Sequence, residues 1–484
     1  METKVKSSKR KVVLWVDWAY DYPRPGGDPG PGEGNDTYYS QGSNPKLFKL
    51  ISSYLLQESS GLESLWVGEF LWNNRHYHDL MNSIGEKVPV HVMTIPTTGY
   101  KGRISNNRVY DFDTGKIARR VLSKEEEAKS IYGSPKNYEL MIIPSISVYS
   151  PEKLIGVSKE EDASNFYAMH AKFIAGFRKN GTAFLILPSC NSDILSEVQT
   201  NTLFAVLDLA GEEVSRLKFM VDHIVKVLSV KQDEFGAIEE WEDRADTLSR
   251  YSIGSLPLGN IGFTCPTVSG SGDALMGLLC SRAEQARDTM IWSAQHFTQY
   301  GTIGDAVSRS IGNCKRTMIL SQTYLEVKGD HFQPAYFNAD MLSRPFRYTL
   351  RKTKNTENIL KLIDQIGPVS ARHPEAFAYC CNQDWHGRFL VTEDSFVAYN
   401  HNMAFSNLFN GKSYFHYDGK WIRTGERTPD TTKSSLFGEI GCFFVLDDPQ
   451  FSAGVISGLS SGLLSDRKTA CVYGSLGKWS ENKS

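Results

Sequence analysis

The stretch FYAMHAKFIAG, residues 166 to 176, is an apolar run that predicts a buried β-strand, yet it contains a histidine and a lysine. Side chains two residues apart on a strand point to the same face of the sheet. His170 and Lys172 are therefore expected to project together from a segment that is otherwise suited to the protein core. An ionisable pair in such a place raises the question of a functional site.

The composition of the whole chain limits the number of domains and the classes of ligand that can be expected. With 484 residues the chain is longer than most single domains, so two domains or two fused halves are expected. Apolar residues make up 40%, charged residues 22% and aromatic residues 12%, as in ordinary globular proteins. The formal net charge of −2 argues against a surface that tracks nucleic-acid phosphates non-specifically, because such surfaces are clearly basic. A local basic pocket remains compatible with it.

The cysteines and the apolar runs indicate the cellular location that is expected for the protein. The eight cysteines are scattered and none forms C-x-x-C, so we expect neither a zinc site nor a disulfide framework, and no cofactor. The apolar run Val12 to Val16 ends at Asp17, which is too short for the core of a signal peptide. No run approaches the length of a membrane span. The sequence predicts a cytoplasmic monomer without stable membrane insertion.

Helices and apolar strands alternate in the same order in both halves, which favours an α/β layer structure. In the first half we expect strands at 11–16, 62–70 and 88–95, with helices at 45–56 and 75–84. In the second half we expect helices at 272–287 and 302–311, with strands at 289–296 and 316–323. The offset of about 225 residues indicates duplicated, pseudo-two-fold halves, each a mixed sheet flanked by helices. A helix at 212–229 precedes the boundary, which gives halves at 1–235 and 256–484.

The motif that opens this subsection also repeats. WHGRFLVTED, residues 385 to 394, places His386 and Arg388 two residues apart at the start of another apolar strand. His386 follows His170 by about 216 residues, close to the offset of the halves. A bare H-x-K is a weak signal in a chain with eleven histidines, so the register of the two copies is what makes it informative.

Each copy is followed by a second strand that ends in polar residues. GTAFLILPSCN ends at Ser189 and Asn191, and SFVAYNHN ends at Asn400 and Asn402. A strand–turn–strand hairpin would bring each asparagine back beside the histidine and the cation of its own half.

The pattern resembles the signature of the phospholipase D superfamily, H-x-K-x4-D-x6-G-S-x-N, once per half. The details are most similar to the branch that holds lysosomal 5′ exonucleases and poxvirus envelope and nicking proteins. The chain departs from the signature at Phe177, where aspartate is expected, and at Arg388 and Glu393 in the second copy. The Gly-Ser turn reads Pro188-Ser189 and Tyr399-Asn400.

The resemblance implies a phosphodiesterase that needs no metal. One histidine attacks phosphorus to form a phosphohistidine, and the other protonates the leaving oxygen. His170 is expected as nucleophile and His386 as general acid/base, although the residues themselves leave the order open. The groups expected to hold the phosphate are Lys172, Arg388, Asn191 and Asn402, with Ser189 and Asn400 also binding substrate.

A nucleophilic histidine also needs an acceptor on its other ring nitrogen. By the resemblance, Glu439 in FGEIG is expected to supply it in the second half and Gln199 in the first. The expected substrate is a nucleic-acid end or a phospholipid. The alternative is a catalytically degraded protein of the same fold that binds a phosphate ligand or a partner, which the residues at 388 and 400 motivate. One further motif, G-x-S-x-G at 458–462, is rejected as a nucleophile elbow because no histidine follows it.

Overall fold

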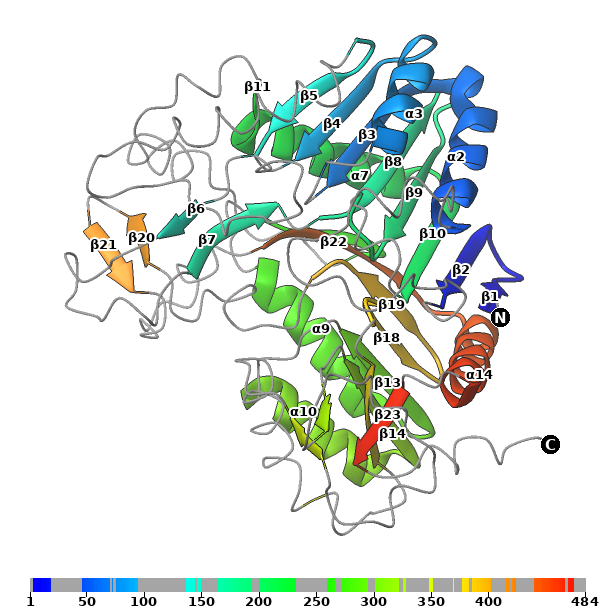
Figure 1. Cartoon of the computed structure of the whole chain (residues 1–484), viewed down its shortest axis with the longest axis vertical. Helices are drawn as coiled ribbons and strands as arrows, with labels where there is room; N and C mark the ends of the chain where they lie inside the picture. Colours follow the sequence, from blue (N-terminus) through cyan, green and yellow to red (C-terminus); the bar gives the residue numbers. More distant parts are fainter. Residues whose placement is uncertain are drawn as a thin grey trace.

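A computed structural model describes large parts of both halves and shows two extended mixed sheets of nine and ten strands with helices packed on their faces (Figure 1). The described residues are 3–18, 46–69, 72, 75–94, 136–143, 146–148, 164–169, 171–192, 200–231, 259–265, 271–294, 301–321, 325–327, 348–350, 369, 377–382, 385–401, 414–417, 420–423, 439–465 and 469–473.

The first sheet belongs almost entirely to the first half of the chain. Its strands, in spatial order, are β1 (Thr3–Lys6), β2 (Val12–Asp17), β10 (Asn201–Leu209), β9 (Ala183–Pro188), β8 (Phe173–Arg178), β3 (Leu62–Glu69), β4 (Val90–Thr94), β5 (Glu139–Ile142) and β11 (Val230–Lys231). Helices α2 (Lys46–Glu58) and α3 (Arg75–Gly85) bury their apolar sides on one face. Helix α7 (Glu212–His223), continued by the π-helix η3 (Ile224–Leu228), packs on the other.

The second sheet is built mainly from the second half. Its strands, in spatial order, are β23 (Thr469–Tyr473), β17 (Phe377–Asn382), β14 (Arg316–Ser321), β13 (Thr289–Ala294), β18 (Phe389–Thr392), β19 (Phe396–Tyr399), β22 (Glu439–Leu446), β7 (Ser164–Met169) and β6 (Ile146–Val148), and β12 (Ile261–Thr264) also pairs with β22. Helices α9 (Ser271–Gln285) and α10 (Gly301–Asn313) pack together on one face, and α14 (Pro449–Ser465) packs on the other. Two short hairpins complete the described strands: β15 (Leu325–Val327) with β16 (Tyr348–Leu350), and β20 (Tyr414–Tyr417) with β21 (Lys420–Arg423).

The strand order confirms the predicted duplication. The run β2-β10-β9-β8-β3-β4-β5-β11 corresponds strand by strand to β12-β22-β19-β18-β13-β14-β17-β23. The pairing directions agree as well: β3 and β4 are parallel like β13 and β14, and β8 and β9 are antiparallel like β18 and β19. The predicted α/β class with two mixed, helix-flanked sheets is therefore confirmed. The predicted boundary between 235 and 256 lies outside the described residues.

The prediction of one strand over 166–176 is wrong. Strand β7 ends at Met169 and pairs in parallel with β22 of the second sheet, whereas β8 begins at Phe173 and pairs with β3 and β9 of the first. The chain changes sheets between them, so the alternation of a single strand does not extend across this segment. In the second half β18 likewise begins at Phe389, so that His386 and Arg388 precede it.

Aromatic side chains join the two sheets between their facing surfaces. The Phe204 ring on β10 lies 5.3 Å from that of Phe396 and 5.6 Å from that of Phe444, measured between centroids. Phe451 of α14 packs edge-on against Phe396 at 5.4 Å. Fully buried aromatic pairs of this kind provide much of the apolar area that holds layers together. The sheets therefore share one core and have a fixed relative position.

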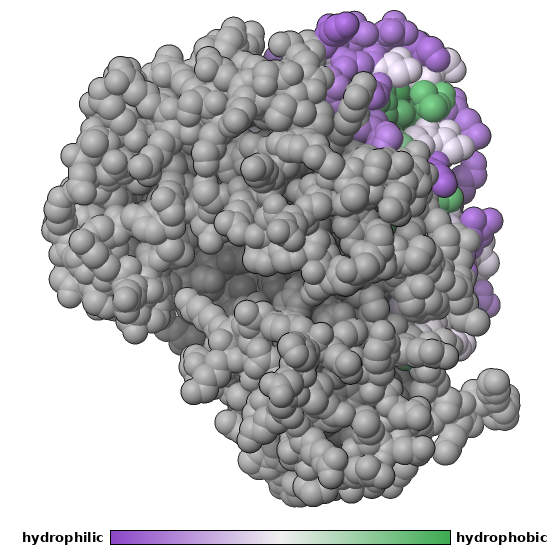
Figure 2. All heavy atoms as spheres, viewed as in Figure 1, coloured by the Kyte–Doolittle hydropathy of each residue, from purple (hydrophilic) through white to green (hydrophobic). Residues whose placement is uncertain are grey.

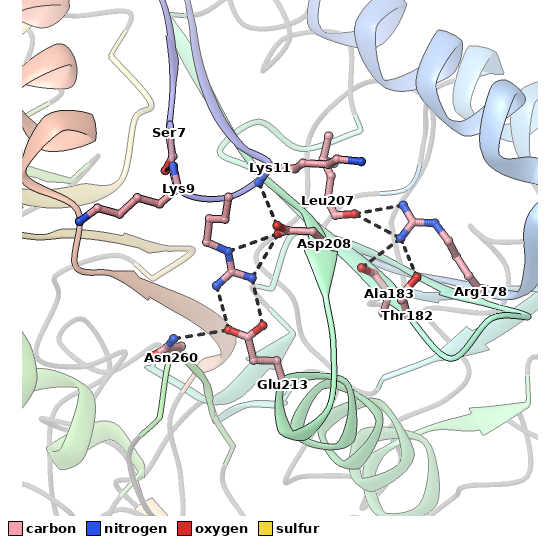
Figure 3. A network of polar contacts seen from close by, with 11 residues as sticks. Ser7, Lys9, Lys11, Arg178, Thr182, Ala183, Leu207, Asp208, Glu213 and Asn260 are labelled. Atoms are coloured by element: carbon pink, nitrogen blue, oxygen red, sulfur yellow. Dashed lines mark hydrogen bonds and ion pairs between the residues drawn. The ribbon is translucent and has the colours of Figure 1, made fainter.

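A charged network at the rim strengthens this contact. The Arg10 guanidinium donates to both carboxylate oxygens of Glu213 at 3.0 Å and to Asp208 at 3.2 Å. Figure 3 shows Asp208, Glu213 and Asn260 around it, with Asn260 donating to Glu213 at 3.4 Å. Asn260 directly precedes β12, so the network links the β1–β2 turn and α7 to the second half. Bidentate pairing makes it stronger than an ordinary surface ion pair.

Helix α14 lies against β1 beside the N-terminus (Figure 1). Asp448 caps the helix by accepting the backbone N–H groups of Gln450 and Phe451 at 3.1 Å each. The rejected motif at 458–462 lies within this helix. The glycines of this motif, Gly458 and Gly462, form with Gly454 a strip on the side of the helix that contacts β1 and Trp18. A Cβ at Gly462 would overlap the Trp18 indole. Their absent side chains allow the close packing.

The described part of the face in Figure 2 is mostly hydrophilic, with a small hydrophobic area beside α2. Leu56 on α2 and Phe219 on α7 are the large apolar side chains with substantial exposure among the described residues. No helix in these same ranges has the length and apolar character to cross a bilayer.

Gly462→Ala is expected to lower the free energy of unfolding by about 1–3 kcal/mol, because the new methyl group must displace the buried Trp18 indole. Gly277→Ala is the matched control: this exposed helix glycine has open space at its Cβ position. There the change should be neutral or stabilising by up to about 1 kcal/mol. Equilibrium urea unfolding measures both. Equal effects would contradict close packing at Gly462.

Candidate active site

The second copy of the motif lies on a tight segment that leads into β18. The Trp385 indole donates to the Ser293 hydroxyl at 2.8 Å and to the Gly387 carbonyl at 3.1 Å. The hydroxyl of Ser293 donates to the same carbonyl at 2.9 Å. A Cβ at Gly387 would lie 2.7 Å from the Trp385 ring, so a side chain between the histidine and the arginine would have to displace a buried indole. This packing fixes the segment that carries His386 and Arg388.

His386 is held by the other half of the molecule. Its Nδ1–H donates to Oδ1 of Asn201 on β10 at 3.2 Å, and its backbone N–H donates to the Thr200 carbonyl at 2.9 Å. An Arg388 N–H lies 3.4 Å from Nε2 of His386. Because a guanidinium can only donate, Nε2 is the acceptor and Nδ1 carries the proton. The ring is thus a neutral imidazole with its lone pair on Nε2, as a nucleophile or a general base requires.

Arg388 also crosses between the halves. It is 2% exposed, and it donates to the backbone carbonyl of Ser189 at 3.0 Å. The Ser189 hydroxyl donates its one proton to Oδ1 of Asn201 at 3.3 Å and accepts the Thr202 N–H at 2.9 Å. Ser189, predicted to bind substrate, therefore supports the amide that orients His386. Arginine can make these simultaneous contacts because its guanidinium is a fixed fork of donors.

Asn400 makes the reciprocal link from the second half to the first. Its amide donates to the Lys172 carbonyl at 2.9 Å and accepts the Cys442 N–H at 3.2 Å. Lys172 itself is fully buried. Asn191 is also buried, and the next residue, Ser192, donates its N–H to the buried carboxylate of Glu69 at 3.3 Å. Residues from both predicted motifs are thus brought into one cross-half network.

Three of the predicted site residues, His170, Gln199 and Asn402, lie outside the described residues. For Glu439 only the backbone is described: it pairs with Ala168 of β7, next to the segment that leads to His170. The roles predicted for these four residues stay predictions.

Sequence reasoning missed Asn201, the residue that orients His386. The available signal was an asparagine at the first position of a mostly apolar strand. Gln199, the predicted candidate, precedes it by two positions. Glu69 was also missed, because an acidic residue at the end of an apolar strand is common at protein surfaces.

The site is electropositive. Burial, together with the positive charges of Arg388 and Lys172, lowers the pKa of His401 to about 3, so this ring is neutral at ordinary pH. Burial raises the pKa of the Cys442 thiol well above its usual range, although Lys172 opposes the shift. An anionic group is the ligand that such surroundings favour.

Side chains that commonly ligate metals do not cluster in the described parts of the chain. Within those ranges, no group of three or more histidine, cysteine, aspartate or glutamate side chains is arranged to hold a metal ion. The cysteines described with their side chains are buried and form no disulfide: Cys190, Cys265, Cys280, Cys314, Cys380 and Cys442.

Neither a protein-family model nor a curated protein sequence matches the chain. Several solved structures are similar. Phosphatidylserine synthase from Haemophilus influenzae Rd KW20 has a TM-score of 0.50 and 12% identity, covering 88% of this chain and 86% of that one. Polyphosphate kinase from Porphyromonas gingivalis has a TM-score of 0.40 and 8% identity, over 87% and 49% of the two chains. Yeast tyrosyl-DNA phosphodiesterase has a TM-score of 0.37 and 10% identity, over 80% and 83%.

At 12% identity, the likeness to the synthase concerns the fold alone. Together with the matching strand orders, it confirms the predicted architecture of two duplicated phospholipase D-like halves. The resemblance to one branch of the superfamily stays a prediction.

Asn201→Leu removes the acceptor of the His386 Nδ1–H while keeping a similar side-chain volume. We expect the ring to lose its single tautomer and the free energy of unfolding to fall by about 1–3 kcal/mol, because a buried donor loses its partner. The nitrogen shifts of His386 in ¹⁵N-detected NMR report the tautomer. In Asn201→Asp, a carboxylate keeps the acceptor and should raise the pKa of His386. A wild-type spectrum with the proton on Nε2 would contradict the assigned hydrogen bond.

Proposed function

We propose that the protein is a metal-independent phosphodiesterase with one active site between its halves, acting on a nucleic-acid end or a phospholipid. The observation that supports this most is the cross-half array in which Asn201 and Arg388 hold His386 with Nε2 as acceptor. A lone pair fixed in this way, next to buried cations, suits attack on phosphorus or deprotonation of an incoming hydroxyl.

In the proposed reaction, the Nε2 of one histidine attacks phosphorus and the bond to the leaving oxygen breaks. The other histidine, His170 or His386 according to the order, gives its proton to that oxygen. The same histidine then takes a proton from water or another alcohol, which attacks the phosphohistidine and releases the enzyme. Lys172, Arg388, Asn191 and Asn402 would stabilise the charge on the non-bridging oxygens, so that no cofactor or metal is required.

The amide of Asn201, which orients His386, helps to decide which histidine is the nucleophile and which is the general acid. Asn201 offers His386 a neutral acceptor, and Arg388 places positive charge at Nε2, so both contacts favour the unprotonated ring in the free protein. A group that starts unprotonated is suited to nucleophilic attack, whereas a general acid must start protonated. These contacts favour His386 as nucleophile, the reverse of the order implied by the sequence resemblance.

Activity in EDTA tests the proposal. We expect release of p-nitrophenol from the p-nitrophenyl ester of thymidine 5′-monophosphate, or of choline from phosphatidylcholine, to survive EDTA. His170→Ala and His386→Ala should each lower it by about 10²-fold or more. Lys87→Ala, an exposed change away from the motifs, is the control and should leave it unaltered. When His170 is absent, a reaction with labelled substrate that is quenched in alkaline denaturant, in which phosphohistidine is stable, should leave the phosphoryl group of the substrate on His386. Loss of activity in EDTA alone would refute the metal-independent reaction.

Arg388→Lys separates an active enzyme from the alternative, a protein that only binds phosphate. The arginine makes hydrogen bonds to Ser189 and to His386, and a lysine cannot place two donors in this fixed geometry. We therefore expect turnover to fall by about tenfold to a hundredfold, in line with the loss of a hydrogen bond from a charged donor. A rise in turnover would indicate that Arg388 is a weakened form of the motif lysine. Binding of phosphate without turnover in either protein would support the alternative.

A further inference from the structure

His401 follows Asn400 directly and is completely buried at the end of β19. Its Nε2 shares a short hydrogen bond with the Thr264 hydroxyl on β12. Its Nδ1 has no hydrogen-bond partner among the residues that the structure describes. Leaving a buried polar nitrogen unsatisfied is energetically costly, so such atoms are uncommon outside functional sites.

The strand registers identify the counterpart of each residue in the other half. Pro188 pairs with Leu203 between β9 and β10, as Tyr399 pairs with Phe443 between β19 and β22. Counting from these pairs, Cys190 corresponds to His401. By the same count, Asn201 corresponds to Gly441.

The two halves show a compensating exchange of size. Where one half has a small Cys190 and a side chain at Asn201, the other has a large His401 and no side chain at Gly441. The His401 ring takes up the room, since a Cβ at Gly441 would overlap its imidazole. In the first half this room holds the amide that orients His386. In the second half the equivalent space is filled by the polar ring of His401, which extends into it from the turn after β19 and not from strand β22.

The charges around His401 suggest what it binds. Among the described residues, Thr264 from β12 and Gly441 from β22 lie against its ring, and the positive charges of Arg388 and Lys172 both act to lower its pKa. In the tautomer in which the Thr264 hydroxyl donates to Nε2, the neutral ring carries its proton on Nδ1, and this is the tautomer that the proposal below requires. An oxyanion is the one ligand that would accept this proton and also pair with the two cations.

Building on the function proposed above, we propose that His401 is a third phosphate-binding histidine, whose Nδ1–H donates to a non-bridging oxygen of a group bound beside Lys172 and Arg388. It binds and orients the anion, and no bond forms or breaks at its ring. The superfamily signature does not supply this residue, because its position is the variable one between the serine and the asparagine of G-S-x-N.

Inorganic phosphate is the probe, and ¹⁵N-detected histidine NMR of the wild-type protein is the first measurement. We expect phosphate to shift the Nδ1 resonance of His401 and to raise its pKa, because an anion offsets the nearby positive charge. His223 is the internal control in the same spectrum. It is another buried histidine whose pKa burial and Lys226 lower, and its ring packs between those of Phe219 and Phe263. Phosphate should leave its resonances unchanged.

Substitution gives the second measurement. His401→Phe fills the same space without a donor and should weaken phosphate binding by about tenfold, the equivalent of one charge-assisted hydrogen bond. His223→Phe should leave the affinity unaltered. If His401→Phe fails to fold, the wild-type spectra decide alone.

The outcomes separate this inference from the proposed enzyme. Failure of phosphate to bind, or binding that leaves His401 unshifted, would overturn the inference, even in a protein that turns over the thymidine ester. A shifted His401 in a protein without turnover on any phosphodiester would support the inference and refute the enzyme. A shift of His223 equal to that of His401 would reveal a general effect of salt and count against a site.

Discussion

The hydrogen bond between Nδ1 of His386 and Oδ1 of Asn201 connects the halves at the point where the chemistry is proposed. Its donor and its acceptor belong to different halves of the chain, so its length depends on how the two sheets are packed. A displacement of 1 Å is enough to break a bond of this kind. The other contacts between the halves keep the two sheets in this relative position. They are the phenylalanines around Phe204, the network around Arg10, and the close fit of α14 on β1.

Local patterns predicted the elements well where they were long and apolar. Strands such as β3, β4, β13 and β14, and helices α2, α3, α9 and α10, lie within a few residues of their predicted ranges. The change of sheet between β7 and β8 could not be predicted, because β7 pairs with a strand more than half the chain away and an apolar run does not specify its partner. Asn201 was missed for the same reason. A motif shows which side chains can react, but not which side chain of the other half orients them.

The halves have diverged in side chains while keeping their strand order. The first half uses Ser189, Cys190 and Asn201 where the second uses Asn400, His401 and Gly441. The equivalent bond is nevertheless kept, since the hydroxyl of Ser189 and the amide of Asn400 each accept an N–H from the neighbouring strand, that of Thr202 and that of Cys442. Such pairs of changes conserve volume and hydrogen bonding, which is what a closely packed interior tolerates. The duplicated framework can therefore support two unequal halves of one site.

The pairing of β7 with β22 also determines when this protein can fold during its synthesis. The partner strand β22 leaves the ribosome about 270 residues after β7, and α14, the support for β1, leaves it later still. Most of the first sheet can assemble early, but β6, β7 and the outer side of β1 must wait while the entire second half is translated. During that interval they expose strand edges that invite wrong pairing. A nascent chain stalled before β22 is therefore a natural substrate for chaperones, even though its first sheet is nearly complete.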